Sequence, residues 1–434
     1  MNELGNALGI ETAAQCRIQV VSLLLYQAVL DDDVGQAFLS LLNTLSTVQG
    51  VANERAQCLS AYGHWFQTLA RTGKSWGDYI LGRLLLADNA FTHATQHCSL
   101  AELPTPLIAA ARHDLQILQD LYTLPPSYIS RWVQTACQLP TAPVEWSLTP
   151  TSLPISLPPK WSDGMSELAD YYQRQGIGQF GQFHGFRWHQ GQLLGLPKTD
   201  PIRLAQLAAY DGPKATLVKN TEFLLAGFNA LNVLLYGSRG SGKSSLVKAL
   251  LNEYGHRGLR LIEIAKADLY DLPVVVNHLR HQPQKFIIFV DDLSFEEDDD
   301  AFKALKVVLE GGITRRPQNV VVYATSNRRH LVREFFADRP RPSDADELKS
   351  WDTVQEKLSF SDRFGLTLTF EPADQPTYLE IVHHLAQQAD IELPTDDLDY
   401  RAKQWATRHN GRSGRSARQF IDFLSADLAS NKGR

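Results

Sequence analysis

The sequence contains few cysteines, and none of them is arranged in a motif that binds metal. No C-x-x-C pair occurs among the four, which are Cys16, Cys58, Cys98 and Cys137. Their spacing therefore gives no support for a thiol-based metal site. We expect a reducing compartment and buried, unreactive thiols.

Long hydrophobic runs and a large excess of charge are also missing. A membrane-spanning helix needs about 18 uninterrupted apolar residues. The best candidate, Val20–Leu30, contains Gln27 and is predicted to be a core helix. The first residues lack the basic start and the small-residue cleavage site of a secretory signal, so we expect a cytoplasmic protein with no membrane segment. The formal net charge of −6 gives no electrostatic reason to expect binding to nucleic acid, although local basic patches could still bind phosphate backbones.

The chain is long enough for two or three domains, because 434 residues exceed a single compact core. Residues 1–138 are predicted to form a helical domain, since apolar residues recur three and four apart in stretches such as Cys16–Leu30, Ala37–Val48 and Tyr79–Leu86. Residues 139–200 start with a proline-rich stretch from Leu139 to Lys160, which is either an extended linker or a wrapping segment. The connecting region that follows shows no clear periodicity from Gly176 to Trp188.

The pattern of apolar residues changes after about Pro201. Short apolar runs, each separated from the next by a helix-length segment, occur at Asn232–Tyr236, Leu259–Ile264, Phe286–Val290, Val320–Thr325 and Leu366–Phe370. This alternation predicts an α/β domain over residues 201–372, with a parallel sheet covered by helices on both faces. Residues 373–434 show helical patterns alone and are predicted to form a small all-helical domain.

A glycine-rich segment follows the first of these strands and carries the strongest functional signal. Residues 237–244, GSRGSGKS, fit the phosphate-binding pattern G-x-x-x-x-G-K-[ST] between a predicted strand and a predicted helix. The three glycines allow consecutive N–H groups to face a phosphate at a helix N-terminus. Lys243 is then expected to reach the β- and γ-phosphates, and Ser244 to bind Mg²⁺. The complete set of expected nucleotide-binding residues here is Gly237, Ser238, Arg239, Gly240, Ser241, Gly242, Lys243, Ser244 and Ser245. By contrast, Thr72–Ser75 (TGKS) lacks the preceding glycine and strand, so we interpret it as a solvated loop.

A second strand supplies the acidic partner that a magnesium nucleotide needs. The apolar run Phe286–Val290 ends in Asp291 and Asp292, as in a Walker B element. Asp291 is the candidate to hold Mg²⁺ and its waters. The alternative is that both acids cap the following helix. The acids of 296–300 are interpreted as a solvated charged face.

Polar residues also follow the strand Val320–Thr325. Asn327 is the candidate to hold the attacking water with its amide. Arg328 and Arg329 come next, and they either contact phosphate or a neighbouring subunit or are ordinary surface residues.

The segments NVLLYGSRGSGKSSLVKALLNEY, FIIFVDDLSFEEDD, FKALKVVLEGGI, VVYATSNRRHLV, EKLSFSDRFGLTLTF and GRSGRSARQFIDFL occur in this order along the chain. From about Gly176 to the C-terminus, the sequence resembles a family of bacterial AAA+ ATPases that is catalogued as a domain of unknown function. The resemblance implies an αβα nucleotide-binding domain, a C-terminal helical lid and assembly into a ring. It also implies that the strand Val320–Thr325 lies between the two strands that carry the phosphate loop and Asp291.

The resemblance extends to three catalytic elements. Asp292 stands where many AAA+ enzymes have a glutamate that polarises the attacking water, so its shorter side chain puts the rate of hydrolysis in question. Arg363 looks like an arginine finger that enters the site of the adjacent subunit, although an ion pair with Asp362 or another acid is the alternative. A lid arginine is expected near the phosphates, with Arg418 matching the usual offset and Arg415 second.

These features predict an ATPase that uses Mg-ATP to change conformation in an oligomer that acts on a macromolecule, with the N-terminal helices as the contact for a protein partner. One alternative is an adaptor that is switched by ATP and hydrolyses little. Another is a DNA-associated factor like a helicase loader, with a basic surface made of Arg315, Arg316, Arg328, Arg329, Arg339 and Arg341. Dispersed solvated charges are the simpler interpretation of these arginines. Residues 268–284 include Tyr270 but no aromatic-hydrophobic-glycine pattern, so protein threading is not indicated.

Overall fold

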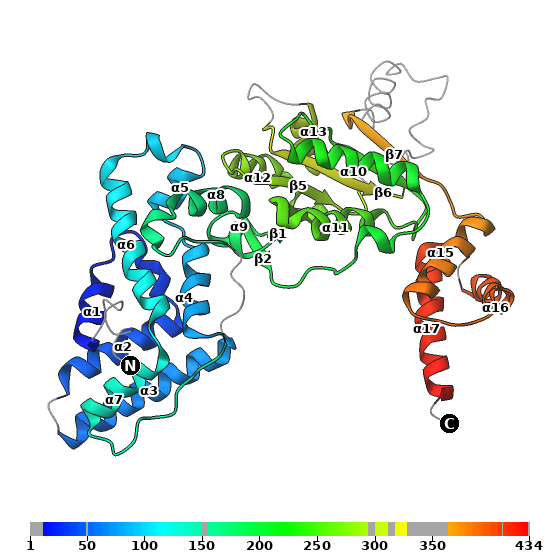
Figure 1. Cartoon of the computed structure of the whole chain (residues 1–434). Coiled ribbons are helices and arrows are strands. Elements are labelled where there is room, and N and C mark those ends of the chain that lie inside the picture. Colours follow the sequence, from blue (N-terminus) through cyan, green and yellow to red (C-terminus); the bar gives the residue numbers. More distant parts are fainter. Residues whose placement is uncertain are drawn as a thin grey trace. The chain divides into compact units, whose positions relative to one another are not determined.

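The computed structural model describes residues 12–48, 51–149, 155–293, 300–310, 317–327, 363–409 and 411–432. The chain forms two compact units, Met1–Gln182 and Phe183–Arg434 (Figure 1). The boundary lies inside the region of 139–200 that we expected to connect the helical and α/β domains.

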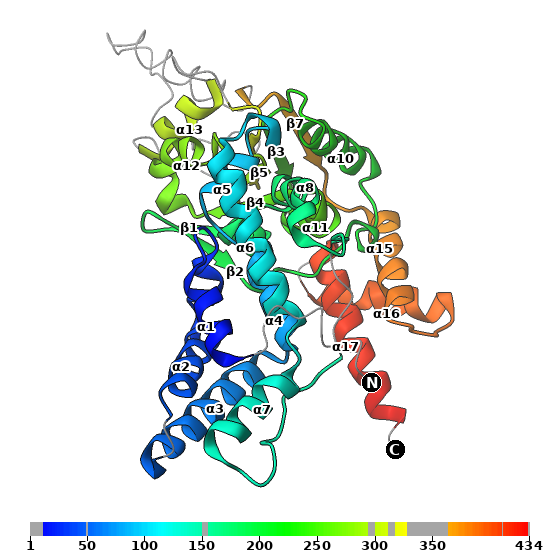
Figure 2. The same cartoon turned by 60° about the vertical axis from the view of Figure 1, so that its left-hand side comes forward.

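The first unit is helical. Its longer helices are α1 (Ala13–Val21), α2 (Asp33–Thr47), α3 (Ala52–Thr72), α4 (Trp76–Leu85), α5 (Ala90–Thr95), α6 (Thr105–Thr123), α7 (Pro126–Cys137), α8 (Met165–Gln175) and α9 (Gly178–Gln182). Short 3-10 helices occur at Gln27–Leu30, Leu100–Glu102 and Trp161–Asp163. Helices α2, α3 and α7 lie side by side in both views (Figures 1 and 2).

Aromatic side chains form the centre of this helical core. The Phe38 ring lies 4.5 Å from that of Trp76, and the Trp65 and Trp76 rings are 5.7 Å apart. Trp65 and Trp76 are fully buried, and the half-buried Trp132 and Trp146 pack against the same core. These four tryptophans therefore contribute to the core of the first unit.

One predicted helix is wrong. Cys16–Leu30 is not continuous, because α1 ends at Val21 and the chain turns before the 3-10 helix Gln27–Leu30. The buried Asp114 carboxylate accepts hydrogen bonds from the backbone N–H groups of Leu24, Leu25 and Tyr26, at 2.7–3.0 Å. These N–H groups bond to a side chain from α6 instead of continuing the helix.

Hydrogen bonds hold the proline-rich stretch against the helical core over residues 139–149. Tyr62 donates to the carbonyl of Val144 at 2.7 Å, Ser130 donates to that of Pro143 at 2.6 Å, and Trp146 Nε1 donates to that of Lys74 at 2.9 Å. Trp161 and the following helix α8 are buried in the same core. Of the two interpretations of this stretch, the wrapping segment is therefore the one that applies to its described residues.

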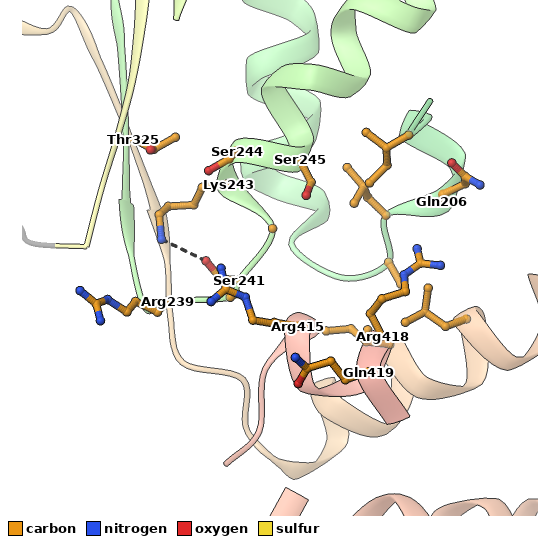
Figure 3. A pocket seen from close by; sticks show the side chains of 18 of the residues that line it. Gln206, Arg239, Ser241, Lys243, Ser244, Ser245, Thr325, Arg415, Arg418 and Gln419 are labelled. Atoms are coloured by element: carbon orange, nitrogen blue, oxygen red, sulfur yellow. Dashed lines mark hydrogen bonds between the residues drawn. The ribbon is translucent and has the colours of Figure 1, made fainter. Parts of the chain in front are cut away.

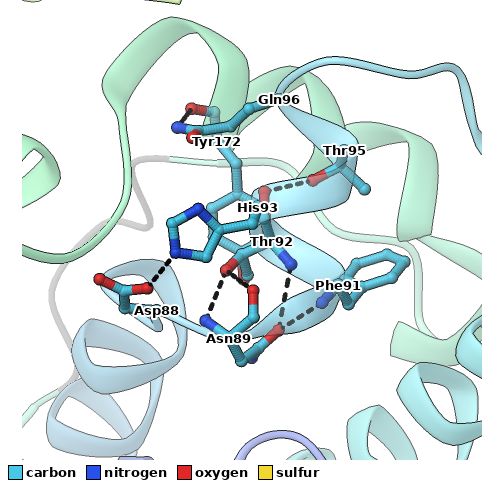
Figure 4. Close-up of polar contacts among 8 residues, drawn as sticks. All are labelled: Asp88, Asn89, Phe91, Thr92, His93, Thr95, Gln96 and Tyr172. Carbon is cyan, nitrogen blue, oxygen red and sulfur yellow. Dashed lines mark hydrogen bonds and ion pairs between the residues drawn. The ribbon is translucent and has the colours of Figure 1, made fainter. Parts of the chain in front are cut away.

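Helix α5 is fixed by a cluster of polar contacts (Figure 4). The Asn89 side chain accepts from the N–H groups of Phe91 and Thr92, and His93 contacts Asp88 at 2.6 Å. Gln96 Nε2 donates to the carbonyl of Tyr172 at 3.2 Å, which connects α5 to α8. The polar residues of this segment therefore have a structural role.

The cysteines are buried with one exception. Cys16, Cys58 and Cys137 are buried, and burial raises the pKa of both the Cys16 and the Cys58 thiol to about 12. Cys98 is exposed, so the expectation of a buried thiol is wrong there. Thr72–Ser75 is the junction of two helices, since Gly73 ends α3 with φ +65° and Ser75 caps α4.

The second unit contains a seven-stranded sheet in the order β2-β1-β4-β5-β6-β3-β7. Its strands are β1 (Gly185–His189), β2 (Gln192–Leu196), β3 (Val233–Gly237), β4 (Leu259–Ile264), β5 (Lys285–Val290), β6 (Val320–Ser326) and β7 (Leu366–Phe370). All five predicted strands are confirmed within one residue at each end. Strand β6 lies between β5 and β3, as the resemblance implies.

The expectation of a purely parallel sheet is wrong at one edge. Strands β1 and β2 form an antiparallel hairpin, and β1 pairs in parallel with β4. Strand β1 overlaps the end of Gly176–Trp188, the stretch in which the sequence shows no clear periodicity. All other pairs are parallel.

Helices cover both faces of this sheet. Every residue of β5 from Phe286 to Val290 is at most 1% exposed, which requires cover on both sides. The helices of this domain are α10 (Asp211–Leu225), α11 (Lys243–Tyr254), α12 (Leu272–Leu279) and α13 (Asp300–Glu310), with 3-10 helices at Leu204–Gln206, Gly255–Arg257 and Lys266–Asp271. The predicted α/β fold class is confirmed.

Three helices follow β7 and have their own small core (Figure 2). They are α15 (Gln375–Gln388), α16 (Thr395–Arg408) and α17 (Gly414–Lys432). Tyr378, Val382, Ala402 and Phe420 are buried between them. Among the residues described in both units, no helix is long and apolar enough to cross a membrane.

Candidate nucleotide-binding site

The phosphate loop connects the end of β3 to the start of α11. Gly237, Gly240 and Gly242 have φ values of +147°, +74° and +89°, a region that other residues rarely occupy. A side chain at Gly237 would also overlap the carbonyl of Phe370. Helix α11 begins at Lys243, so the loop and the helix N-terminus form one surface.

A cavity of about 590 Å³ lies over this loop (Figure 3). It is lined by residues 239–245 of the loop and by Asp291, Asp292, Thr325 and Asn327 from the ends of β5 and β6. Arg415 and Arg418 of α17 also line it. The structure therefore brings together the predicted site residues from four separate segments of the sequence. Gly237 and Ser238 are not part of the lining, but their carbonyl oxygens hold Lys243.

Lys243 is folded back onto the loop. Its ammonium donates to the carbonyls of Ser238 at 2.7 Å and Gly237 at 3.0 Å, and to the Asn327 side chain at 3.3 Å. The residue is only 6% exposed. Burial lowers the pKa of Lys243 below its usual range, and the charges of Asp291 and Asp292 partly oppose this shift. The lysine thus lies in a site that attracts a compensating negative charge.

The Asp291 carboxylate joins three segments. Its Oδ1 accepts from the hydroxyls of Ser244 at 2.6 Å and Thr325 at 2.5 Å, and from the N–H of Asp292 at 3.2 Å. The residue is exposed to the cavity. A carboxylate beside a hydroxyl is a set of oxygen donors that fits Mg²⁺. The alternative that both acids cap a helix concerns residues 294–299, which lie outside the described residues.

Asp292 and Asn327 are in direct contact. Asn327 Nδ2 donates to Asp292 Oδ1 at 2.6 Å, while its Oδ1 accepts from Lys243. Asp292 has φ +51°, which aspartate tolerates better than most residues. The lysine, the amide and the second carboxylate therefore form one hydrogen-bonded chain across the cavity.

The lid contacts the phosphate loop directly. The N–H of Arg415 donates to the carbonyl of Gly240 at 3.2 Å. A Cβ at Gly240 would lie 3.0 Å from Ser413 Oγ, so the loop and the lid approach closely. Figure 3 shows the Arg415 side chain extending from α17 towards Ser241 of the loop and the Arg418 side chain extending towards the segment that carries Gln206. Both predicted lid arginines are therefore in the cavity.

Arg363 is not in this cavity. It precedes β7, whose first residue Leu366 bonds to Asn232 at the amino end of β3. The phosphate loop leaves the opposite end of the same strand. Arg363 therefore precedes the end of β7 that lies beside the start of β3, opposite the end of β3 from which the phosphate loop leaves. The described structure gives no position for Asp362, Arg328 or Arg329, nor for the other arginines of the expected basic surface, Arg315, Arg316, Arg339 and Arg341.

Sequence reasoning missed the apolar wall of the cavity. Ile202, Leu207 and Ala208 lie on one segment before α10, and Ile381 and Leu385 lie on α15. Such a wall can accept the flat face of a nucleotide base. The helical spacing on α15 could not be distinguished from core packing, and Leu207 and Ala208 lie in an irregular segment with no motif.

Comparison with known proteins gives a family. Residues 181–428 match the model of a family described as "Protein of unknown function (DUF815)". The chain belongs to the DUF815 family. This confirms the resemblance found in the sequence, which began at about residue 176. No curated protein matches the chain.

Several solved structures are similar to this DUF815 member over 52% of its chain. A variant of RuvB from Thermotoga maritima shares 14% identity over 72% of its own chain, with a TM-score of 0.32. The Thermotoga maritima RuvB Holliday junction branch migration motor shares 12% over 72%, with a TM-score of 0.31. A DNA replication initiation factor shares 19% over 65%, with a TM-score of 0.33.

Proposed function

We propose that this protein binds and hydrolyses Mg-ATP at the cavity between the phosphate loop and the lid. The observation that carries the proposal is the hydrogen bond between Ser244 and Asp291 beside Lys243. A hydroxyl at a helix N-terminus and a carboxylate at a neighbouring strand tip form the pair that holds a magnesium nucleotide in P-loop proteins. The cavity adds four basic side chains, from Arg239, Lys243, Arg415 and Arg418.

The roles of the side chains follow from their positions. On nucleotide entry Lys243 exchanges the carbonyls of Gly237 and Ser238 for phosphate oxygens, which relieves its burial as an unpaired cation. Ser244 and Asp291 would hold Mg²⁺, which neutralises phosphate charge. Asp292 accepts a proton from the attacking water, and Asn327, now released from Lys243, orients that water.

The position of Arg363 is a reason to propose that the protein acts as an oligomer. Because it lies at the other end of β3 from the cavity, it cannot serve this site without a large movement. A neighbouring copy of the chain can bring its own Arg363 to the γ-phosphate. We therefore propose an active oligomer in which nucleotide binding and hydrolysis change the contacts between subunits. The helical first unit is then free to contact a macromolecular partner.

Phosphate release by purified protein tests this proposal. Lys243→Ala is expected to abolish nucleotide binding, whereas Asp292→Asn is expected to keep binding and to lower turnover by about 100-fold or more. Arg401→Ala is a matched arginine control, because Arg401 forms a surface pair with Asp397 on α16 and does not line the cavity.

Mixing two inactive variants tests the role of Arg363. Arg363→Ala lacks the finger but keeps a cavity that can bind nucleotide, and Lys243→Ala cannot bind nucleotide but keeps the finger. A mixture should recover part of the turnover that neither variant shows alone. If turnover is not recovered at any mixing ratio, Arg363 does not act between subunits.

A second candidate function is an ATP-controlled adaptor with little hydrolysis. The observation that favours it is Asp292, which is shorter than glutamate and is held by Asn327 at 2.6 Å. Tight Mg-ATP binding with no phosphate release at any protein concentration would support the adaptor and exclude the ATPase.

A further inference from the structure

Thr325 lies at the junction of the two strands that supply the polar end of the cavity. In the parallel register of β5 and β6, Val290 pairs with Ala324, which places Thr325 level with Asp291. Thr325 lines the cavity but is only 2% exposed. A buried hydroxyl beside a carboxylate is held in one orientation by its neighbours.

The Thr325 hydroxyl acts as acceptor and donor at once. It accepts from the N–H of Asp292 at 2.9 Å and donates to Asp291 Oδ1 at 2.5 Å. A hydroxyl has a single hydrogen to donate, so this hydrogen is fully used on Asp291. The same hydroxyl therefore fixes the side chain of one acid and the backbone of the next.

All hydrogen bonds to the Asp291 side chain end on the same oxygen. Ser244, Thr325 and the N–H of Asp292 all donate to Oδ1. Among the described residues, none donates to Oδ2. The two oxygens of one exposed carboxylate thus have different surroundings, and Oδ2 is the oxygen left for a metal ion or its waters.

The backbone after β5 is tied to the same strand tip. The N–H of Leu293 donates to the carbonyl of Thr325 at 2.7 Å, and Ser326 Oγ donates to the carbonyl of Leu293 at 2.8 Å. Between these bonds and β5 lies Asp292, with its φ of +51°. The left-handed turn that presents Asp292 is therefore supported from β6 on both sides.

We propose that Thr325 is a positioning residue for the metal: its hydroxyl holds Asp291 Oδ1 within the protein and so assigns Oδ2 to magnesium. The inference rests on the proposed function, because it presumes a magnesium nucleotide in this cavity. Without the hydroxyl, the Asp291 carboxylate can rotate and the N–H of Asp292 loses its nearer acceptor. The binding of the metal then weakens, while the contacts of the loop with the phosphates persist.

Nucleotide titrations of the full chain test the proposal. A fluorescent ATP analogue is titrated in excess Mg²⁺ and again in EDTA, and the ratio of the two affinities measures the contribution of the metal. Thr325→Val removes the hydroxyl at nearly constant volume, and Thr325→Ser keeps it. Thr367→Val is the matched control, since Thr367 is an exposed strand residue on β7 outside the cavity. Mn²⁺ binding in the presence of ADP, followed by electron paramagnetic resonance, gives a second readout that is independent of turnover.

Thr325→Val is expected to reduce the ratio by about 10-fold or more, because a hydrogen bond to a charged group is lost. Its affinity in EDTA should stay within about twofold of the wild type. Thr325→Ser and Thr367→Val should keep the full ratio. An unchanged ratio in Thr325→Val, or equal losses in Thr325→Val and Thr325→Ser, overturns the role of Thr325. A wild-type protein with no magnesium dependence overturns the proposed function itself.

Discussion

At the residue scale, two aspartates have different roles, one structural and one at the cavity, because different hydrogen-bond donors surround them. Asp114 is fully buried, and three backbone N–H groups from 24–26 use both of its oxygens. Asp291 is exposed, and its three donors crowd onto Oδ1. A carboxylate whose lone pairs are saturated serves the fold, whereas one with a free oxygen at a cavity can serve a ligand.

Replacing Asp114 with alanine should destabilise the first unit. The backbone N–H groups of Leu24, Leu25 and Tyr26 would be left without their acceptor, and the expected loss in the free energy of unfolding is about 3 kcal/mol. Urea unfolding followed by tryptophan fluorescence measures it. Asp120→Asn is the control, because Asp120 lies on the same helix and is hydrogen-bonded to Gln116 at 3.3 Å. A loss no larger than that of Asp120→Asn would contradict the role given to Asp114.

The two lid arginines should be separable by the number of phosphates. Arg418→Ala is expected to lower ATP affinity by about 10-fold while leaving ADP affinity near the wild type, because it loses a charged contact to the terminal phosphate. The Arg415 side chain lines the cavity and extends towards Ser241 of the phosphate loop (Figure 3), so Arg415→Ala should weaken ATP and ADP alike. Isothermal titration calorimetry measures both. Arg412→Ala controls for charge, since Arg412 bonds to Gln375 and does not line the cavity. If Arg415→Ala lowered only the affinity for ATP and Arg418→Ala lowered the affinities for ATP and ADP alike, the roles of the two arginines would be exchanged.

The sequence predicts the polar half of the site better than the apolar half. Lys243, Ser244 and Asp291 could be identified because a phosphate loop and a strand-end acid have fixed local patterns. Thr325 could not, because its importance arises from the pairing of β5 with β6 and leaves no motif. Ile381 and Leu385 are apolar residues one turn apart on a helix, and such residues usually face a core.

At the element scale, the errors of prediction occur where tertiary contacts outweigh local pattern. Hairpin β1–β2 was missed because the sequence around β1 is rich in glycine and aromatic residues and has no clear apolar periodicity. Its strand β1 is stabilised by pairing with β4, which is far along the chain. The helix predicted over Cys16–Leu30 breaks because Asp114 offers its backbone a better partner. The strands β4 and β7, which are short apolar runs with clear ends, were predicted without error.

The contact between the lid and the phosphate loop should be sensitive to one methyl group. A Cβ at Gly414 would lie 3.0 Å from the carbonyl of Gly240, so Gly414→Ala is expected to push the start of α17 away from the loop. Because both lid arginines are on this helix, nucleotide affinity should fall by about 10-fold, as if a charged contact were removed. Gly212→Ala is the matched control, since a Cβ there meets nothing within 4 Å. Fluorescent-nucleotide titration compares the two, and equal affinities would mean that the lid does not need this approach.

At the scale of the whole molecule, the chain contains separate hydrophobic cores. The first unit has its own core, centred on Trp65 and Trp76, and the second has one on the sheet and another among the lid helices. The cavity is built entirely from residues of the second unit. The energetic effect of a nucleotide should therefore be confined to that unit.

Differential scanning calorimetry should resolve this division. We expect two transitions, of which only the one that belongs to Phe183–Arg434 responds to nucleotide. A ligand at 100 times its dissociation constant stabilises the folded state by about 2.7 kcal/mol, which for a unit of this size corresponds to about 5–10 °C. The first transition should be unmoved, because no described residue of the first unit lines the cavity. Lys243→Ala removes the ligand shift and should leave both transitions in place. A single transition that moves as a whole with nucleotide would mean that the two units unfold cooperatively, and the independence argued from their separate cores would then be wrong.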